Sequence, residues 1–77
     1  MDELIRNIGL LYTTELGIER IKRNLGLRTD DVVAWCRQSI LSTENIQRRG
    51  KNWYVYTSKC VITVNAHNYT IITAHKD

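Results

Sequence analysis

The feature that most constrains this chain is a single change in the spacing of its apolar residues. From residue 3 to residue 41 they recur at helical spacing, and from residue 45 to residue 75 they alternate or cluster in β-branched and aromatic runs. This order predicts an α+β fold, in which two to three helices over about residues 2–41 pack on one face of a four-stranded antiparallel sheet over about residues 45–75. A chain of 77 residues has room for one domain, residues 1–77.

Capping and stop signals divide the first half into three helical segments. A short helix is expected to begin at Asp2, whose carboxylate suits a helix N-terminus. Thr13 and Thr14 offer capping hydroxyls to a second helix, which Gly26 ends. Thr29, followed by two aspartates, is the expected cap of a third.

Turn residues divide the second half into four strands, expected at residues 45–49, 53–57, 60–65 and 69–75. Gly50, Ser58 and Asn68 stand in the breaks, where a residue must tolerate positive φ or bond back to the main chain. Consecutive short turns of this kind predict an antiparallel meander backed by helices.

The period of two along a strand assigns the faces of this sheet. Trp53 and Val55 fall on one side and Tyr54 and Tyr56 on the other. We expect the first pair to pack on the helices and the second to lie on an open face, which is either simply hydrated or a surface that stacks bases and holds phosphates.

The charge balance favours a polyanionic partner. Eleven lysines and arginines against eight acids give a net charge of +3, which raises encounter rates with nucleic acid. The residues expected to bind nucleic acid are the basic and aromatic side chains of the second helix, the first hairpin and the C-terminal end: Arg20, Arg23, Arg48, Arg49, Lys51, Tyr54, Tyr56 and Lys76.

Several classes of protein are not indicated. No apolar run approaches the roughly 20 residues that cross a bilayer, and the first residues do not resemble a secretory signal, so no membrane association and a cytoplasmic location are expected. Cys36 and Cys60 lack metal-ligand spacing and are expected to be reduced and buried. The sequence therefore predicts neither a metal site nor a cofactor.

Three stretches of the chain, "YTTELGIERIKRNLGL", "DDVVAWCRQSI" and "GKNWYVYTSKCVITVNAHNYTIITAHK", resemble an uncharacterised family of small bacterial and phage proteins. That family begins T-T-E-L-G-x-E-R-I-K and ends I-T-V-N-A…I-I-T-A-H-K. The layout more distantly resembles the barnase–EndoU–colicin–RelE group of RNases and toxins, which implies metal-independent RNA cleavage on an open sheet face. Relatives tend to carry histidine before T-T-E-L-G, where this chain has Tyr12.

Candidate catalytic residues follow from the chemistry of RNA cleavage, which needs a base, an acid and cations around the phosphate. His75 is the first candidate because histidine titrates near neutrality, and His67 is the second; the competing interpretations are a solvated residue near the chain end and a plain turn residue. Glu19 beside Arg20 and Arg23 is the third candidate, or else the hydrated side of an amphipathic helix.

Two functional hypotheses therefore stand. In the first, the chain is a toxin-like effector that binds RNA. If it is an enzyme, it is a metal-independent endoribonuclease. In the second, it is a non-catalytic module, such as a phage-encoded inhibitor or a homodimer, that binds a protein partner through the strand edge "NIQRR".

Overall fold

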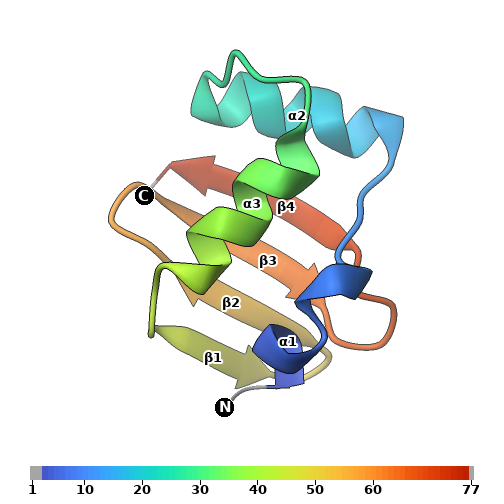
Figure 1. The fold of residues 1–77 in the computed structure, drawn as a ribbon, viewed down its shortest axis with the longest axis vertical. Helices are drawn as coiled ribbons and strands as arrows, with labels where there is room; N and C mark the ends of the chain where they lie inside the picture. The colour runs from blue at the N-terminus through green and yellow to red at the C-terminus, as the bar shows by residue number, and fades with distance from the viewer. Residues whose placement is uncertain (1–2, 77) are drawn as a thin grey trace.

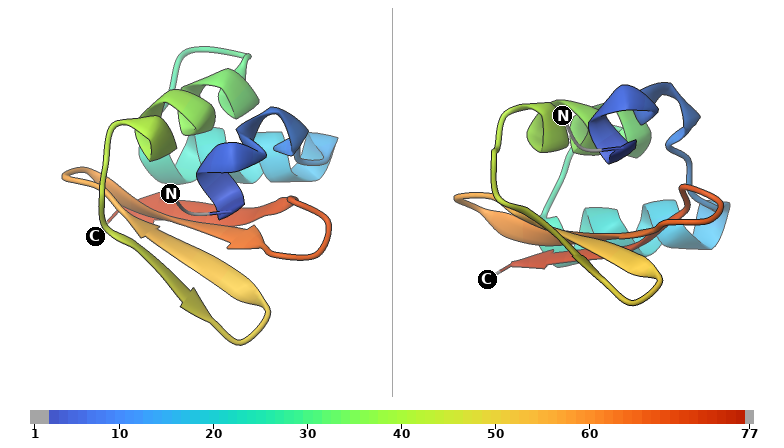
Figure 2. Two further views of the ribbon diagram at one scale, coloured as in Figure 1. Left: turned by 60° about the horizontal axis from the view of Figure 1, so that its bottom comes forward. Right: turned by 90° about the horizontal axis from the view of Figure 1, so that it is seen from below.

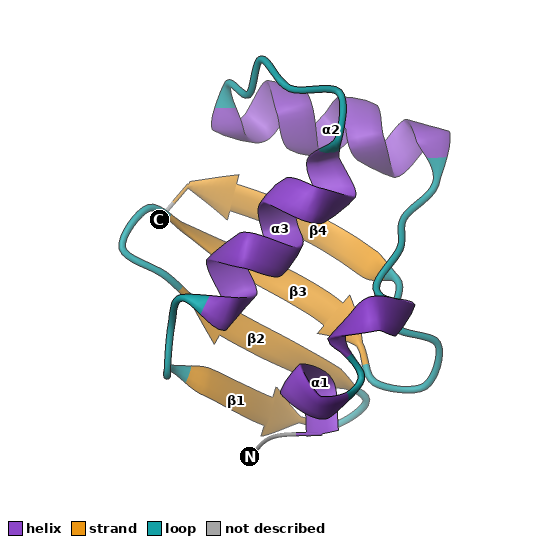
Figure 3. Ribbon diagram, viewed as in Figure 1, coloured by secondary structure: helices purple, strands orange, loops and turns teal. Residues whose placement is uncertain are grey.

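The computed structural model describes residues 3–76, and within them helices precede strands as expected. The elements are α1 (Glu3–Arg6), a 3-10 turn η1 (Ile8–Leu10), α2 (Glu15–Leu25), α3 (Val32–Leu41), β1 (Ile46–Arg49), β2 (Asn52–Tyr56), β3 (Cys60–Asn65) and β4 (Ile71–Lys76). The strands form one antiparallel sheet in the order β1-β2-β3-β4 (Figures 1 and 3). The predicted α+β class and meander are confirmed, whereas the helix start expected at Asp2 lies outside the described residues.

Local signals set most element ends. The Thr14 hydroxyl accepts an N–H of the first turn of α2 at 3.0 Å, and Gly26 ends that helix with a φ of 66°. Gly50 has a φ of 60° in the β1–β2 turn, as expected. The cap of α3 is Asp31 rather than Thr29, because the carboxylate of Asp31 reaches the N–H three residues later at 3.1 Å. The Thr29 hydroxyl instead accepts the Asp31 N–H in the preceding turn.

In the β3–β4 turn Asn68 bonds back to the main chain, as expected, because its side-chain oxygen accepts the Thr70 N–H at 3.0 Å. The left-handed residue of this turn is Tyr69, with a φ of 62°. The side-chain oxygen of Asn65 accepts the N–H groups of His67 and Asn68, which fixes the turn before Tyr69 is reached. The Tyr69 ring packs against Trp53, with ring centroids 5.3 Å apart, and this contact offsets the cost of left-handed backbone.

The core lies between the sheet and the layer formed by α1 and α3. α3 crosses the sheet and α1 lies beside it on the same face (Figures 1 and 2). Buried side chains come from every layer: Leu4, Leu11, Ile21, Val32, Cys36, Ile40, Trp53, Val55, Cys60, Ile62, Val64, Ile71 and Ala74. The expected burial of both cysteines as free thiols is confirmed.

α2 lies along the edge of β4 instead of covering the sheet face (Figure 2). Asn24 donates its side-chain N–H to the Ala74 carbonyl at 3.2 Å, and the Thr13 hydroxyl donates to the Ile71 carbonyl at 3.1 Å. The Ile71 N–H in turn donates to the Tyr12 carbonyl at 2.8 Å. These bonds occupy three backbone groups of β4, and the packing of α2 along the strand covers this edge of the sheet.

Candidate nucleic-acid interface

The sheet face that points away from α1 and α3 is called here the open face. Strand alternation and register assign to it Gln47, Arg49, Asn52, Tyr54, Tyr56, Val61, Thr63, Asn65, Thr73 and His75. Tyr54 and Tyr56 are partly exposed there, while Trp53 and Val55 are buried on the other side. The predicted division of β2 between the two faces is confirmed.

Arg49 and the two tyrosines form one cluster on the open face. The guanidinium carbon of Arg49 lies 4.7 Å from the ring centroid of Tyr54 and 6.0 Å from that of Tyr56. Arg49 also donates a hydrogen bond to the Tyr56 hydroxyl. A cation held against two aromatic rings at a surface is stabilised by the ring quadrupoles and stays close to both of them.

The floor of the open face is nearly closed to solvent although no helix covers it. Val61 and Thr63, on β3, are 8% and 7% exposed, and they lie directly opposite Tyr56 and Tyr54 on β2. Larger neighbours on the flanking strands shield them, so the tyrosine rings stand above a shallow, well-packed floor. His75 lies opposite Val61 on β4, in the same row as Tyr56 and about 10 Å from it, two strand spacings away.

Arg48, one of the residues expected to bind nucleic acid, is not part of this face. It pairs with Trp53 in the β1–β2 register, which puts its side chain on the helix side of the sheet. There its guanidinium carbon lies 5.5 Å from the Trp53 ring centroid and its Nε donates to the Gly50 carbonyl at 2.8 Å. Alternation along a strand separates two consecutive arginines in this way, and only Arg49 joins the tyrosines.

The remaining basic candidates on the strands lie at the margins. Lys51 is exposed in the β1–β2 turn, where its carbonyl accepts the Ala66 N–H at 2.8 Å. Lys76 pairs with Cys60 in the register and therefore points to the side of the sheet opposite His75. Neither lysine shares the tyrosine rows of the open face.

The arginines of α2 lie at the β4 margin of the open face, opposite the β1 margin where Arg49 lies. Asn24 faces β4, and the 100° step of the helix places buried Ile21 about 60° from it on the core side. The same geometry puts Arg20 about 40° and Arg23 about 100° from Asn24 in the opposite direction, which is the side of the open face. Both arginines are exposed. Basic side chains therefore border the tyrosines at the β1 margin and at the α2 margin.

The three candidate catalytic residues do not meet. His67 follows the end of β3, whereas His75 pairs with Val61 near the beginning of β3, so they lie at opposite ends of the β3–β4 hairpin, about 13 Å apart along the strand. Glu19 is exposed and lies about 140° from Asn24 around α2, in the same direction as Arg23 and about 40° beyond it, so it is turned farther from β4 than either arginine. Within residues 3–76, no three histidine, cysteine, aspartate or glutamate side chains gather as metal ligands do.

The fold and its surface define a small α+β protein with an aromatic and cationic sheet face. Residues 5–75 match the model of the family described as "Protein of unknown function (DUF3781)", and the chain belongs to that family. The sequence-based assignment to an uncharacterised family is confirmed to that extent. No curated protein and no solved structure matches the chain. Over residues 3–76, none of the helices has the length and apolar character needed to cross a membrane.

Proposed function

We propose that this protein binds single-stranded RNA on the open face of its sheet. The observation that carries the proposal is the cluster in which Arg49 lies over Tyr54 and bonds to Tyr56. A base stacks on a tyrosine ring whatever its identity, because every base has a π-face. Because Arg49 lies over the Tyr54 ring, a base either stacks on the guanidinium plane or moves it aside toward the phosphate that follows.

The dimensions of the open face suit a short stretch of nucleotides. Four strands give about 14 Å between β1 and β4, and four-stranded sheets with exposed aromatic residues stack two or three bases. Arg49 borders this span at one margin, and Arg20 and Arg23 border it at the other. The backbone of a bound strand would thus meet positive charge where it enters and where it leaves.

The proposal is limited to binding. Metal-independent cleavage, which the distant likeness to the RNase and toxin group implies, needs an acid and a base on opposite sides of one phosphate. His75 lies beside the tyrosine rows, but His67 and Glu19 are directed elsewhere. The geometry therefore supports an RNA ligand better than it supports an RNA substrate.

A matched pair of variants tests the proposal. Fluorescence anisotropy with a labelled single-stranded RNA would compare Arg49→Gln with Arg48→Gln, two changes of the same residue type in the same strand but on opposite faces. Arg49→Gln is expected to weaken binding and to lower the log–log salt slope by about one, while Arg48→Gln leaves both unchanged. Tyr54→Ala should weaken binding about 5- to 150-fold, the loss of one stacked base.

The proposal fails if the wild-type protein shows no RNA binding at low salt, or if the two arginine variants behave alike. Far-UV circular dichroism of each variant separates a lost contact from a lost fold. Cleavage has its own readout, because intact RNA after long incubation at high protein concentration in a chelating buffer excludes the metal-independent reaction.

The edge of β1 favours a second candidate function, the binding of an extended segment of a partner protein. The Tyr56 N–H donates to the Asn45 carbonyl, so the alternating antiparallel pattern leaves the backbone groups of Arg48 directed outward. The arginines of β1 favour an acidic partner strand over a second copy of the chain, because like charges oppose self-pairing. Slower amide exchange at Arg48 in the presence of an acidic partner would support this function, and unchanged exchange would oppose it.

A further inference from the structure

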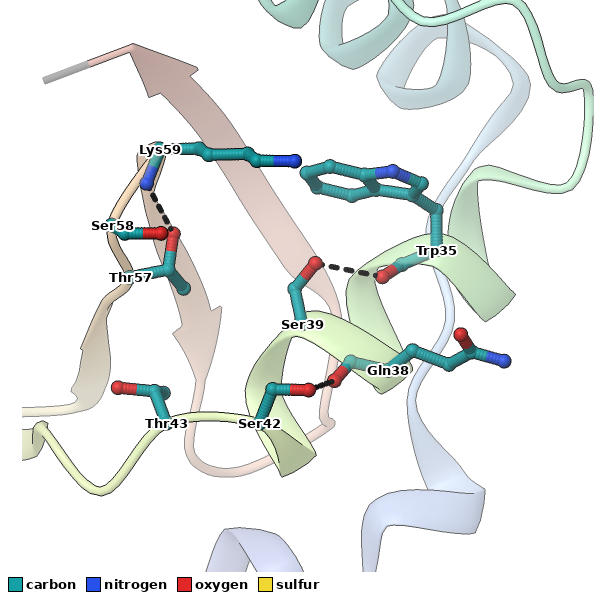
Figure 4. Close-up of a pocket in the computed structure, with 8 residues that line it drawn as sticks. All are labelled: Trp35, Gln38, Ser39, Ser42, Thr43, Thr57, Ser58 and Lys59. Carbon is teal, nitrogen blue, oxygen red and sulfur yellow. Dashed lines mark hydrogen bonds between the residues drawn. The ribbon is translucent and has the colours of Figure 1, made fainter.

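A pocket of about 500 Å³ opens on the helix side of the protein, between α3 and the β2–β3 turn (Figure 4). Its walls are Trp35, Gln38 and Ser39 from α3, Ser42 and Thr43 that follow the helix, and Thr57, Ser58 and Lys59 from the turn. None of these residues belongs to the open face. The volume lies within the range of about 300–1,000 Å³ that is typical of small-molecule sites.

The charge of the pocket selects an anion. Lys59 is the one charged residue in its lining, and no carboxylate shares the walls with it. Lys59 is exposed, and its side chain extends across the pocket toward the Trp35 ring (Figure 4). The Ser58 hydroxyl lies at the opposite wall, beside the backbone of Lys59, and makes no hydrogen bond to the described residues (Figure 4). A donor for an anionic oxygen is therefore available there, and the long, exposed Lys59 side chain can turn back toward it.

The helix wall adds an aromatic surface and hydrogen-bond acceptors. Trp35, Ser39 and Ser42 follow one another at helical spacing, so they line one side of α3. The Ser39 hydroxyl donates to the Trp35 carbonyl at 3.0 Å and the Ser42 hydroxyl donates to the Gln38 carbonyl at 2.7 Å. Each serine oxygen has its proton committed to the helix and keeps lone pairs that can accept from a ligand. The indole of Trp35 is half-buried and offers a partly exposed ring for stacking.

We propose that this pocket binds a nucleoside monophosphate. The base stacks on the Trp35 ring, its exocyclic and ribose donors reach the hydroxyl oxygens of Ser39 and Ser42, and the phosphate meets the Lys59 ammonium and the Ser58 hydroxyl. Aromatic surface, acceptors and a single cation occur together here, and this combination matches a ligand that is planar at one end and anionic at the other. The site is separate from the proposed RNA-binding face.

Two-dimensional NMR titration with adenosine monophosphate tests this assignment. The Trp35 indole N–H and the backbone amides of residues 57–59 should shift and saturate with a common Kd below about 1 mM. Trp53 is 3% exposed, so its indole signal should stay in place and serves as an internal control. Adenosine without its phosphate is expected to bind at least about tenfold more weakly, because it lacks the charged contact.

Lys59→Met and Lys51→Met form the matched pair of variants. Both lysines are exposed turn residues, but they lie at opposite ends of β2. Lys59→Met should raise the Kd for adenosine monophosphate at least about tenfold, and Lys51→Met should leave it unchanged. Shifts that do not saturate, that map away from Trp35, or that respond equally to both substitutions would overturn the proposal. Binding of inorganic phosphate as tight as that of the nucleotide would overturn the stacking of a base.

Arg49→Gln keeps the two proposals distinguishable. This variant alters the open face and leaves every residue of the pocket in place, so nucleotide binding should persist when RNA binding is lost. Loss of both activities in Arg49→Gln would contradict the separation of the two sites.

Discussion

The buried thiol of Cys36 makes alkaline unfolding a quantitative test of the core. Cys36 is fully buried on α3, and this burial raises the pKa of its thiol from an ordinary 9.0 to about 12, with the charge of nearby Cys60 as a smaller cause. The folded protein therefore keeps a proton that the unfolded chain releases.

The sign and size of the effect follow from this difference in pKa. Because the pKa is higher in the folded state, the stability linked to Cys36 is fully present below pH 9 and is lost as the pH rises toward 12. Between pH 8 and pH 10 the free energy of unfolding should fall by about 1.4 kcal/mol from this group, and the loss approaches about 4 kcal/mol near pH 12.

Urea unfolding of the wild-type protein and of Cys36→Ala at pH 8 and at pH 10 measures this contribution. Tyrosines and lysines also titrate in this range, but they are common to both proteins and cancel in the comparison. The wild-type protein should lose about 1.4 kcal/mol more than the alanine variant over this interval. Equal losses in the two proteins would refute the argument, because the Cys36 thiol would then ionise as readily in the folded state as in the unfolded one.

Two further predictions concern α2 and the glycines, each with an internal control. Gly26→Ala should destabilise the protein by about 1 kcal/mol in thermal or urea unfolding, because a φ of 66° is strained for alanine, whereas Gly9→Ala has open space and should be neutral. Ile21→Ala should cost about 2–5 kcal/mol because the side chain is 1% exposed, while Leu16→Ala on the same helix, at a residue 60% exposed, should cost less than about 0.5 kcal/mol. Similar costs within either pair would contradict the placement of that residue.

The elements of the fold could be predicted because their signals are local. A change of period marks the boundary between helices and strands, and the Thr14 hydroxyl and the left-handed Gly26 determine the ends of α2 from within a few residues. The cap of α3 shows the limit of such signals. Thr29 and Asp31 can both cap a helix, and the choice depends on whether the hydroxyl or the carboxylate oxygen reaches a free N–H of the first helical turn once the chain has folded.

Features that depend on distant contacts were not predictable in the same way. Tyr69 has the left-handed backbone of the β3–β4 turn, and its ring packs against Trp53, sixteen residues earlier in the chain. Arg48 and Arg49 could not be told apart by composition alone. Alternation along β1 places these consecutive arginines on opposite faces, and the register with β2 shows which of them shares the face of Tyr54.

Part of the pocket could have been predicted from the sequence of α3, although the candidate site was sought on the strands. Trp35, Ser39 and Ser42 share one side of α3, and polar side chains on a helix that must also bury Cys36 indicate a second environment beside the core. What the sequence alone does not specify is the wall opposite them. Lys59 comes to the pocket only because the β2–β3 turn lies next to the end of α3.

The position of α2 links the architecture of the sheet to the proposed interface. A free β4 edge would offer unpaired backbone groups, and Thr13 and Asn24 occupy them from the helix side. A helix that lies at the edge of a sheet has one side toward the core and another toward the open face. This placement of α2 puts Ile21 in the core and Arg20 on the side of the open face. A helix stacked fully on the sheet would carry its charges to the outer surface of the helix layer, far from the tyrosines. The edge position of α2 therefore explains both why the sheet can pair freely only through β1 and why positive charge is found at both margins of one face.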